Sequence, residues 1–351
     1  MTDPVSILAV SEAFPPHRLY QEEVVGLCEG VFAGRPEMFE RLKDAYANAG
    51  VESRSSCVPI DWYNSPHGWP ERAALFQENA LALLEQAAAD ALGKAGLTAQ
   101  DVDTVVAVST TGITTPSLDA HLLNSLGFRS DINRLPIFGL GCVGGVTGLA
   151  RAADMARTRP GQTVLLLVVE LCALTFRPQE MTKANIIASA LFGDGAAAIV
   201  LRSGAVDGAP ALYHGSAEHT WPDSLDIMGW RVEDDGLGVI FSRDIPTLVR
   251  QDVRPAMESF LESHGTRLSA LSGIVAHPGG RKVLEAYEGA LGLSGEVLRH
   301  ARSVLRDQGN MSAVTALCVL NRAIGAGDKG LHAMMALGPG FTAGFGLVEL
   351  A

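Results

Sequence analysis

The sequence predicts a duplicated α/β fold, in which each of two similar halves combines parallel strands with crossover helices. Two observations predict it. The same order of elements occurs twice along the chain. Each time an apolar helix is followed by a buried strand, by a second helix that begins at a polar or glycine-rich turn, and by two further strands. The spacing also agrees, because Val106 precedes Cys142 by 36 positions and Val275 precedes Asn310 by 35. A fixed order at a fixed spacing is typical of an internal repeat, and parallel strands need crossover connections.

In the first half, small apolar residues at helical spacing predict a helix over 80–96, and an apolar run predicts a buried strand over 101–109. A helix is expected to begin at Cys142 and to continue to Ala156. Apolar runs predict two strands after it, over 163–170 and 196–201.

In the second half, a helix over 253–264 leads to a strand over 271–277. A helix is expected to begin at Asn310, and strands over 333–337 and 344–349 close the chain.

The two halves are expected to span residues 1–205 and 206–351. Residues 202–210 contain Gly, Pro and Asp and predict a linker between them. Residues 218–245, with two Trp and scattered acidic residues, are expected to form an insertion in the second half.

Composition narrows the functional class. With 47% hydrophobic and 19% charged residues, the chain predicts an ordered protein with a large core. The formal net charge of −12 argues against a nucleic-acid partner. The five cysteines match neither a zinc pattern nor a disulfide framework. No basic leader and no apolar run long enough for a transmembrane segment are present, so we expect a soluble, cytoplasmic protein without a metal.

The most informative stretch is Gly-Leu-Gly-Cys-Val-Gly-Gly, in which the cysteine is Cys142. Glycines on both sides allow a tight turn from strand to helix. A helix start is expected to lower the pKa of the thiol and to offer N–H groups to an oxyanion. This pattern predicts a nucleophile, although a buried structural cysteine is the alternative.

A histidine and an asparagine are the candidate partners of this cysteine. His277 ends a predicted strand and precedes Pro-Gly-Gly, while Asn310 opens a predicted helix. If the halves pack about a pseudo-twofold axis, both residues approach Cys142. An imidazole can take the thiol proton, and a neutral amide can donate to an enolate. The alternatives are a structural histidine and an asparagine N-cap.

Glycines and basic residues follow the histidine. Gly279 and Gly280 free the backbone to cradle a thioester tail, and Arg281 and Lys282 could meet phosphates. A solvated helix start is an equally good interpretation of the two basic residues.

With these residues the chain resembles the type III polyketide synthases, the chalcone synthase superfamily within the thiolase fold. The resemblance covers nearly the whole chain, and it implies a layered αβαβα fold, a Cys142–His277–Asn310 triad, and a homodimer. It also implies acyl-CoA and malonyl-CoA as substrates, with no cofactor. The motifs are Gly141-Cys142-Val-Gly-Gly, Leu174-Thr-Phe-Arg-Pro, Ala190-Leu-Phe-Gly-Asp-Gly, His277-Pro-Gly-Gly, Gly309-Asn-Met-Ser and Gly338-Pro-Gly.

Position by position, the resemblance makes Phe192 the first of two rings at the cavity mouth. The second position falls near Val239, so one large ring is expected to be missing. Of the basic residues that hold coenzyme A in plant members, only Arg41 has a match. The residues expected to line the cavity are Thr110, Thr111, Cys172, Thr175, Gly229 and Ser312.

The resemblance is closest to bacterial alkylpyrone and alkylresorcinol synthases, which accept long fatty acyl starters. Cys172 and Val239 are small, which favours a channel for an alkyl chain. Thr110, Glu170 and Ser312 match a hydroxyl–carboxylate–hydroxyl network that supports aldol closure, although Glu170 could instead tie a strand end to its neighbours. Alkylpyrone with some alkylresorcinol is therefore the expected product.

Three rival functions use the same residue types. A ketoacyl synthase III-like enzyme would condense once and use acyl carrier protein. A papain-like cysteine hydrolase also has Cys, His and Asn in this chain order, but with its cysteine near the N-terminus. A non-enzymatic binding protein would not require all three residues.

Overall fold

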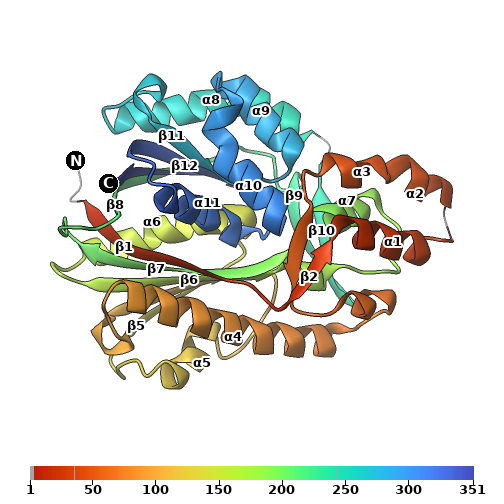
Figure 1. Ribbon diagram of the computed structural model, residues 1–351, viewed down its shortest axis with the longest axis horizontal. Coiled ribbons are helices and arrows are strands. Elements are labelled where there is room, and N and C mark those ends of the chain that lie inside the picture. The colour runs from red at the N-terminus through yellow and green to blue at the C-terminus, as the bar shows by residue number, and fades with distance from the viewer. Residues whose placement is uncertain (1–3, 35, 243) are drawn as a thin grey trace.

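The computed structural model describes residues 4–34, 36–242 and 244–351. Its layers follow one another as helices, sheet, helices, sheet and helices (Figure 1). The two sheet layers are parts of one mixed nine-stranded sheet. Its strands are β1 (Val5–Ala13), β4 (Thr104–Ser109), β5 (Asn133–Phe138), β6 (Thr163–Leu171), β7 (Asp194–Ser203), β8 (Ala211–Thr220), β11 (Gly273–Ala276), β12 (Gly330–Gly338) and β13 (Thr342–Leu350).

The strand pairing repeats within this sheet. In the first half β4 pairs with β6 in parallel, β6 with β7 antiparallel, and β7 with β1 antiparallel. In the second half β11, β12, β13 and β8 follow the same sequence of pairings. The halves join where β1 and β8 run antiparallel, with Val5 opposite Tyr213. The predicted duplication is confirmed, while the boundary at residue 205 stays a prediction. Strand β5 extends the first half only and forms a sheet edge.

Helices cover the outer faces of the two sheet layers. Helix α4 lies against β1, β6 and β7, since a stripe with Phe76, Ala80, Leu84 and Ala87 is buried along it. None of the described helices is long and apolar enough to cross a membrane. The helices of these outer layers are α4 (Trp69–Lys94) and α5 (Leu118–Ser125) on one side, and α8 (Ile245–Ser263), α9 (Arg281–Leu291) and α10 (Arg299–Gln308) on the other.

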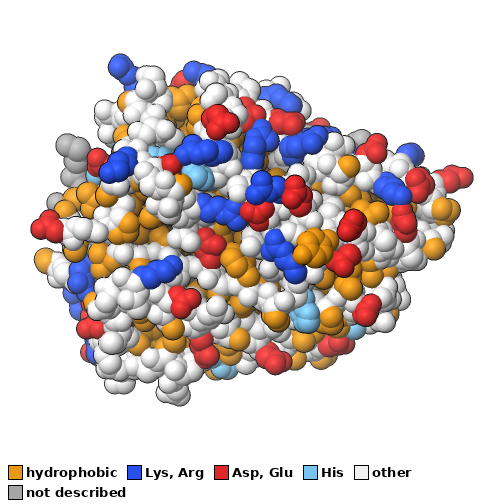
Figure 2. All heavy atoms as spheres, viewed as in Figure 1, with side chains coloured by type: hydrophobic (Ala, Val, Ile, Leu, Met, Phe, Trp, Pro, Cys, Tyr) orange, Lys and Arg blue, Asp and Glu red, His pale blue; other side chains and the backbone are white. Residues whose placement is uncertain are grey.

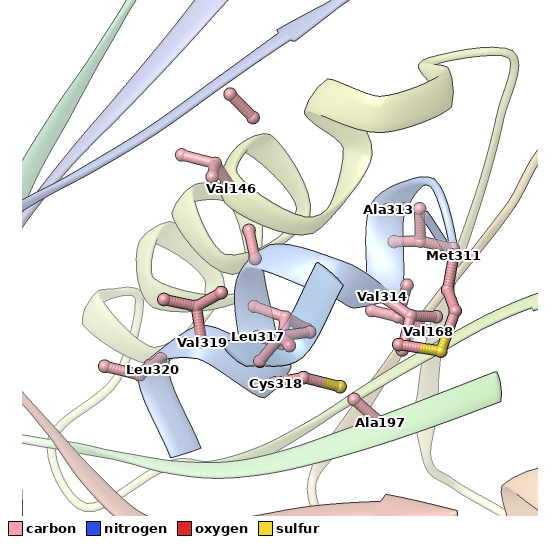
Figure 3. Packing of buried hydrophobic residues seen from close by; sticks show 14 of the residues in the cluster. Val146, Val168, Ala197, Met311, Ala313, Val314, Leu317, Cys318, Val319 and Leu320 are labelled. Carbon is pink, nitrogen blue, oxygen red and sulfur yellow. The ribbon is translucent and has the colours of Figure 1, made fainter. Parts of the chain in front are cut away.

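The central layer consists of two helices that correspond in the repeat, α6 (Gly144–Arg157) and α11 (Ala313–Gly325). Figure 3 shows their apolar side chains, among them Val146 and Leu317, filling the space between them. A Cβ atom at Gly145 would lie 2.0 Å from the carbonyl oxygen of Ala313, so the two helix starts can touch only through glycine. The segments that precede the helices therefore meet.

Those segments differ from the prediction in detail. A 3₁₀ turn, η3 (Gly141–Val143), precedes α6, and α11 begins at Ala313 rather than at Asn310. Asn310 is therefore not an N-cap, because the capping position belongs to Ser312.

The remaining elements gather at the end of the molecule opposite to both chain termini (Figure 1). The predicted insertion over 218–245 contains the hairpin of β9 and β10. These elements are β2 (His17–Tyr20), β3 (Ser53–Ser56), β9 (Met228–Glu233), β10 (Gly236–Phe241), α1 (Gln21–Val31), α2 (Pro36–Leu42), α3 (Asp44–Asn48) and α7 (Lys183–Leu191). The other 3₁₀ helices are η1 (Ile60–Asn64), η2 (Ala99–Asp101), η4 (Cys172–Thr175), η5 (Leu268–Ala270) and η6 (Gly295–Leu298).

The surface carries mixed charge. On the face in Figure 2, Lys and Arg form a band that is interrupted by Asp and Glu. Ion pairs account for part of this mixing, for example Arg302 with Glu288 and Arg299 with Asp328. This face therefore offers no continuous basic stripe to a nucleic acid.

Candidate active site

Cys142 lies in the 3₁₀ turn that leads into α6. The preceding Gly141 has φ +54°, and a Cβ atom there would lie 2.6 Å from Pro339. Its N–H donates to Thr110 Oγ1 (2.9 Å), which fixes the turn. Cys142 is half-buried, whereas the other four cysteines are buried. It is the most accessible of the five cysteines.

The thiol of Cys142 is not acidified by its position. Burial raises its pKa to about 12, and the charge of Glu170 raises it as well, while a hydrogen bond from Ser312 lowers it. The expected lowering of the pKa at a helix start is therefore wrong for the free protein, because lost hydration of the thiolate outweighs the favourable groups. Cys142 stays a thiol until a base removes its proton.

His277 directly follows β11, and its N–H donates to the carbonyl of Met335 (2.8 Å). The side chain is buried, and neither ring nitrogen has a hydrogen-bond partner within the described ranges. Burial lowers the pKa of His277 to about 4. The imidazole is neutral at pH 7, with one nitrogen free to accept a proton and the other free to donate one.

Asn310 connects the segments of the site. Its side-chain Oδ1 accepts from the N–H of Ser312 (2.8 Å), and Nδ2 donates to the carbonyl of Gly279 (3.4 Å), two residues beyond His277. Ser312 in turn lies within hydrogen-bonding reach of the Cys142 thiol. The segments with Cys142, His277 and Asn310 are therefore in contact, as the repeat predicted.

A buried carboxyl lies beside these segments. Oε2 of Glu170 accepts from the N–H groups of Thr110 and Thr111 (3.0 Å each) and from Thr111 Oγ1 (2.7 Å). Burial raises the pKa of Glu170 to about 7, and the Ser312 hydroxyl lowers it. On one side of the expected network, the threonine hydroxyl that donates to Glu170 belongs to Thr111, while the Thr110 hydroxyl accepts from the N–H of Gly141. On the other side, Oε1 of Glu170 has no hydrogen-bond partner among the described residues, so a hydrogen bond with Ser312 stays a prediction.

The mouth residue Phe192 packs against two rings of the β9–β10 hairpin. Its ring centroid lies 5.8 Å from those of Trp230 and Phe241. Val239 is buried opposite Trp230 in the hairpin. Phe241, two positions along the same strand face, places a ring against Phe192, and the expectation that the second mouth position lacks a large ring stays a prediction.

Two small cavities diverge beside this mouth, and Thr175 lines both. One is mainly apolar. Cys172 and Phe192 line its near side, and Leu27 and Cys28 of α1 line another part of its wall. The other cavity lies between Thr111 and Phe76. Cys172 and Thr175 thus face the first cavity, and their contact with substrate stays a prediction.

An open groove of about 820 Å³ borders the site. Gly279, Gly280, Arg281 and Lys282 line it, and their contact with coenzyme A stays a prediction. Lys183 adds a basic residue that sequence analysis did not identify. Part of the Arg281 guanidinium is already engaged by Asn48 (2.9 Å).

Two further predicted residues lie apart from these cavities. Arg41 is exposed on α2 and does not line the groove, so its expected contact with coenzyme A is not supported. Gly229 has φ +154° in β9, and a Cβ atom there would lie 3.9 Å from Pro339. It therefore borders the Gly-Pro-Gly loop rather than either small cavity.

Two buried residues near the site carried no signal in the sequence. Tyr287 of α9 has no hydrogen-bond partner for its hydroxyl among the described residues, and burial and the nearby Cys142 both raise its pKa. Arg54 of β3 is buried next to the end of α7. Neither residue stands in a recognisable motif.

Comparison with known proteins agrees with this geometry. The family descriptions "Chalcone and stilbene synthases, N-terminal domain" and "C-terminal domain" match residues 64–205 and 213–348. A putative chalcone synthase of Bacillus subtilis is 37% identical, over 96% of each chain. A 1,3,6,8-tetrahydroxynaphthalene synthase of Streptomyces peucetius is also 37% identical, over 98% of this chain and 93% of the relative. A phloroglucinol synthase of Pseudomonas fluorescens is 32% identical, over 94% and 95%.

The solved structures agree as well. The crystal structure of 1,3,6,8-tetrahydroxynaphthalene synthase from Streptomyces coelicolor, a bacterial type III polyketide synthase, superposes with a TM-score of 0.93 at 26% identity, over 98% of this chain and 99% of that one. The chain therefore belongs to the chalcone and stilbene synthase family and is a type III polyketide synthase.

Proposed function

We propose that this enzyme loads a long-chain acyl group from coenzyme A onto Cys142, extends it with malonyl-CoA, and cyclises the product mainly to an alkylpyrone. The observation that carries the proposal is the mainly apolar cavity that Cys172 and Phe192 line on its near side. Each CH₂ of an alkyl chain that enters such a space gains about 0.8 kcal/mol. The cavity itself measures only about 40 Å³, so a long chain would have to widen it, and its apolar lining favours such a chain over a polar group.

In the loading step His277 takes the proton of the Cys142 thiol. The thiolate attacks the acyl carbonyl, the bond to the coenzyme A sulfur breaks, and the departing thiolate receives the proton back from His277. Two observations support this role of His277: both ring nitrogens lack other partners, and burial keeps the imidazole neutral beforehand. Backbone N–H groups at the start of α6 are the candidate donors to the transient oxyanion.

In the extension step malonyl-CoA loses CO₂, and the electron pair of the broken C–C bond forms an enolate. Asn310 Nδ2 and His277 donate to the enolate oxygen. The enolate carbon then attacks the acyl group on Cys142, and the thiolate leaves. The orientation of the amide supports this assignment, because Ser312 holds its oxygen and leaves Nδ2 as the donor.

The groove bordered by Gly279 and Gly280 is the proposed path of the coenzyme A arm. Lys183, Arg281 and Lys282 supply positive charge there, on a chain whose formal net charge is −12. Local cations of this kind attract phosphates although the protein as a whole repels them.

For ring closure we propose that Glu170, Thr111 and Ser312 support a minor aldol route to alkylresorcinol. A carboxyl with a pKa of about 7 can exchange protons near neutral pH. Lactonisation to a pyrone needs only attack of an enol oxygen on the thioester, and it is the proposed main route.

We also propose that the enzyme works as a homodimer in the cytoplasm. The edge strand β5 supports the first part, because its pairing edge is open and the side chain of Phe138 is 60% exposed. The five unpaired cysteines support a reducing compartment.

The names of two relatives point to a second candidate class of product for this enzyme. Tetrahydroxynaphthalene and phloroglucinol, for which two relatives are named, are hydroxylated rings without an alkyl chain. An enzyme of that type would use the apolar cavity for the growing polyketide instead of a starter chain. Family membership, in turn, sets aside the cysteine hydrolase and the non-enzymatic binding protein.

Mass spectrometry of products decides between these classes. The purified protein is incubated with malonyl-CoA alone and with malonyl-CoA plus acyl-CoAs from C4 to C20, and Cys142→Ala is the control. We expect alkylpyrones from the longer starters and none from the control. If malonyl-CoA alone gives as much product as the mixtures with acyl-CoA, and no alkylated product forms, the proposed long-chain starter is contradicted. A requirement for acyl carrier protein would instead identify a different acyl donor.

A further inference from the structure

Arg54 is a charged residue that the fold buries almost completely. It lies in β3, and the residue is only 2% exposed. Nη1 donates to the carbonyls of Ser189 (2.6 Å) and Phe192 (3.3 Å), and Nη2 donates to that of Ala190 (3.2 Å). Arg54 therefore binds the carboxyl end of α7, where backbone carbonyls have no partner within the helix.

Asn310 completes the same helix end. Its N–H donates to the carbonyl of Leu191 (2.7 Å), the one that Arg54 leaves free, and its own carbonyl accepts from Gly193 N–H (3.1 Å). The carbonyls of residues 189–192 are thus satisfied by these two residues together with Gln21. A parallel bridge also pairs Asn310 with the mouth residue Phe192. The carboxyl end of α7 therefore connects three groups: the buried guanidinium of Arg54, Asn310 of the site, and Phe192 at the cavity mouth.

The space around this connection is filled. A Cβ atom at Gly193 would lie 2.4 Å from the carbonyl oxygen of Gln308, and one at Gly309 would lie 2.6 Å from that of Leu191. Both would also lie within 3.5 Å of the Arg54 Cβ atom. The stem of Arg54 therefore packs against the contact between the two segments, and a shift of one segment is transmitted to the other.

Among the described residues, no carboxylate forms an ion pair with Arg54. Gln21 accepts from Nη2, while its own amide nitrogen donates to the carbonyls of Ala190 (3.1 Å) and Tyr46 (3.0 Å). Burial lowers the pKa of Arg54 to about 10, so the guanidinium keeps its charge at neutral pH. A cation at the carboxyl end of a helix is favourable, and a planar fork reaches several carbonyls that a single ammonium cannot.

We propose that Arg54 is a positioning residue for the decarboxylation step: by holding the end of α7, it fixes Asn310 at the site and Phe192 at its mouth. This inference rests on the role proposed above for Asn310. Misplacement of a catalytic group by about 1 Å costs about 10²-fold in rate. Loss of Arg54 is therefore expected to affect enolate formation more than acylation of Cys142, which does not use the amide.

The test separates these two half-reactions in Arg54→Ala, Arg54→Lys and Asn310→Ala. Loading is measured as acylation of Cys142 by intact-protein mass spectrometry, and decarboxylation as release of CO₂ from malonyl-CoA. Both rates are expressed per folded protein, determined by circular dichroism. We expect both Arg54 variants to lose about 10²-fold more in decarboxylation than in loading. Methylguanidinium at millimolar concentration should partly restore Arg54→Ala, because it replaces the missing donors. If Arg54→Ala does not fold, the two rates are compared in Arg54→Lys, because lysine keeps the positive charge and most of the bulk.

Arg72→Ala is the matched control. Arg72 is also buried and donates to backbone carbonyls, those of Leu174, Phe176 (3.0 Å) and His67 (2.9 Å), but none of the hydrogen bonds found for it among the described residues reaches α7 or Asn310. It should lower the melting temperature and leave the ratio of the two rates unchanged. An unchanged ratio in the Arg54 variants, together with impaired decarboxylation in Asn310→Ala, would overturn the positioning role alone. An unaffected Asn310→Ala would overturn the proposed role of the amide and this inference with it.

Discussion

At the scale of single residues, the chemistry of the site depends on where protons reside before substrate binds. The Cys142 thiol has its pKa raised to about 12, and the His277 imidazole has its pKa lowered to about 4. Burial by itself therefore favours the thiol form of Cys142 and the neutral form of His277. Glu170, with a pKa of about 7, is the group here whose charge changes near neutral pH, and its charge raises the pKa of Cys142.

Glu170→Gln should therefore make Cys142 more reactive in alkaline solution. Below about pH 7 the wild-type carboxyl is protonated, so both proteins should react alike with iodoacetamide. Above that pH the wild-type carboxylate raises the pKa of the thiol, and the variant lacks this charge. The ratio of alkylation rates, variant over wild type, should rise as the pH passes through about 7, measured by mass spectrometry of the Cys142 peptide.

The control for this experiment is Asp194→Asn. Asp194 is likewise a buried carboxyl with a raised pKa, but its contacts are the N–H groups of Cys57 and Ala173 rather than Ser312. Its rate ratio should not change with pH. A flat ratio for Glu170→Gln would show that the carboxyl charge does not act on Cys142.

Ser312→Ala should shift the products further toward alkylpyrone. The substitution removes the hydroxyl that interacts with both Glu170 and Cys142, while the unusual backbone at this position (φ +47°) is kept. Thr111→Val, which removes the hydroxyl on the other side of Glu170, should shift the products in the same direction. Chromatography of products from a single starter measures the resorcinol share, and an unchanged share in both variants would remove the network from ring closure.

At the scale of helices and strands, the position of Cys142 and Asn310 depends on the contact between α6 and α11. Glycine is required there because the backbone of α11 occupies the space of a side chain. Sequence analysis predicted this approach from the repeat, since equivalent helices of duplicated halves meet at the symmetry axis. It could not predict that α11 begins three residues after Asn310, because the 310–312 segment is shaped by tertiary contacts with Leu191 and Gly193.

Gly145→Ala tests this contact against a matched glycine. The new Cβ atom would lie 2.0 Å from a backbone oxygen, so the helices must separate, and we expect a loss of about 1–3 kcal/mol together with loss of acylation. Gly289→Ala, on the exposed face of α9, meets nothing within 4 Å and should stabilise the protein by about 0.5–1 kcal/mol. Denaturant unfolding measures both, and equal effects of the two substitutions would contradict the close approach.

Cys172→Phe tests the cavity between η4 and α1. A ring at this position fills the near end of the apolar branch, so long starters should be excluded while short acyl-CoAs still react. Cys172→Ala is the control, since it keeps the space open and removes only the sulfur. Competition between C4 and C16 starters measures the preference, and undiminished use of C16 by Cys172→Phe would place the alkyl chain elsewhere.

The pattern of successes and errors at this scale has a physical cause. Buried strands such as β6 and the helices of the repeat were predictable because uninterrupted apolar runs or helical spacing mark them. Strand β5 was missed because its residues alternate between exposed and half-buried and include Arg and Pro. Phe241 was missed because pairing within the β9–β10 hairpin, rather than sequence position, decides which ring meets Phe192.

At the scale of the whole molecule, the two halves share one sheet that continues through the β1–β8 pair and ends at β11 and β5. The duplicated order along the chain was enough to predict this organisation. The partners of Arg54 at the end of α7 were not predictable, because they lie about 135 positions away and only folding brings them together. The free edge at β5 likewise became visible only in the folded sheet.

Disruption of the β5 edge should separate the proposed homodimer. Phe138 exposes 60% of its surface, and an open strand edge that carries an apolar side chain is a template for pairing with a second copy. Phe138→Asp adds a charge that would have to be buried in such an interface, so the variant should sediment as a monomer at micromolar concentration, where the wild type sediments as a dimer. Leu225→Asp is the control, because Leu225 is 82% exposed and lies outside β5. Analytical ultracentrifugation measures both variants. A dimer that survives Phe138→Asp unchanged, or a wild-type protein that is already monomeric, would show that β5 is not the interface.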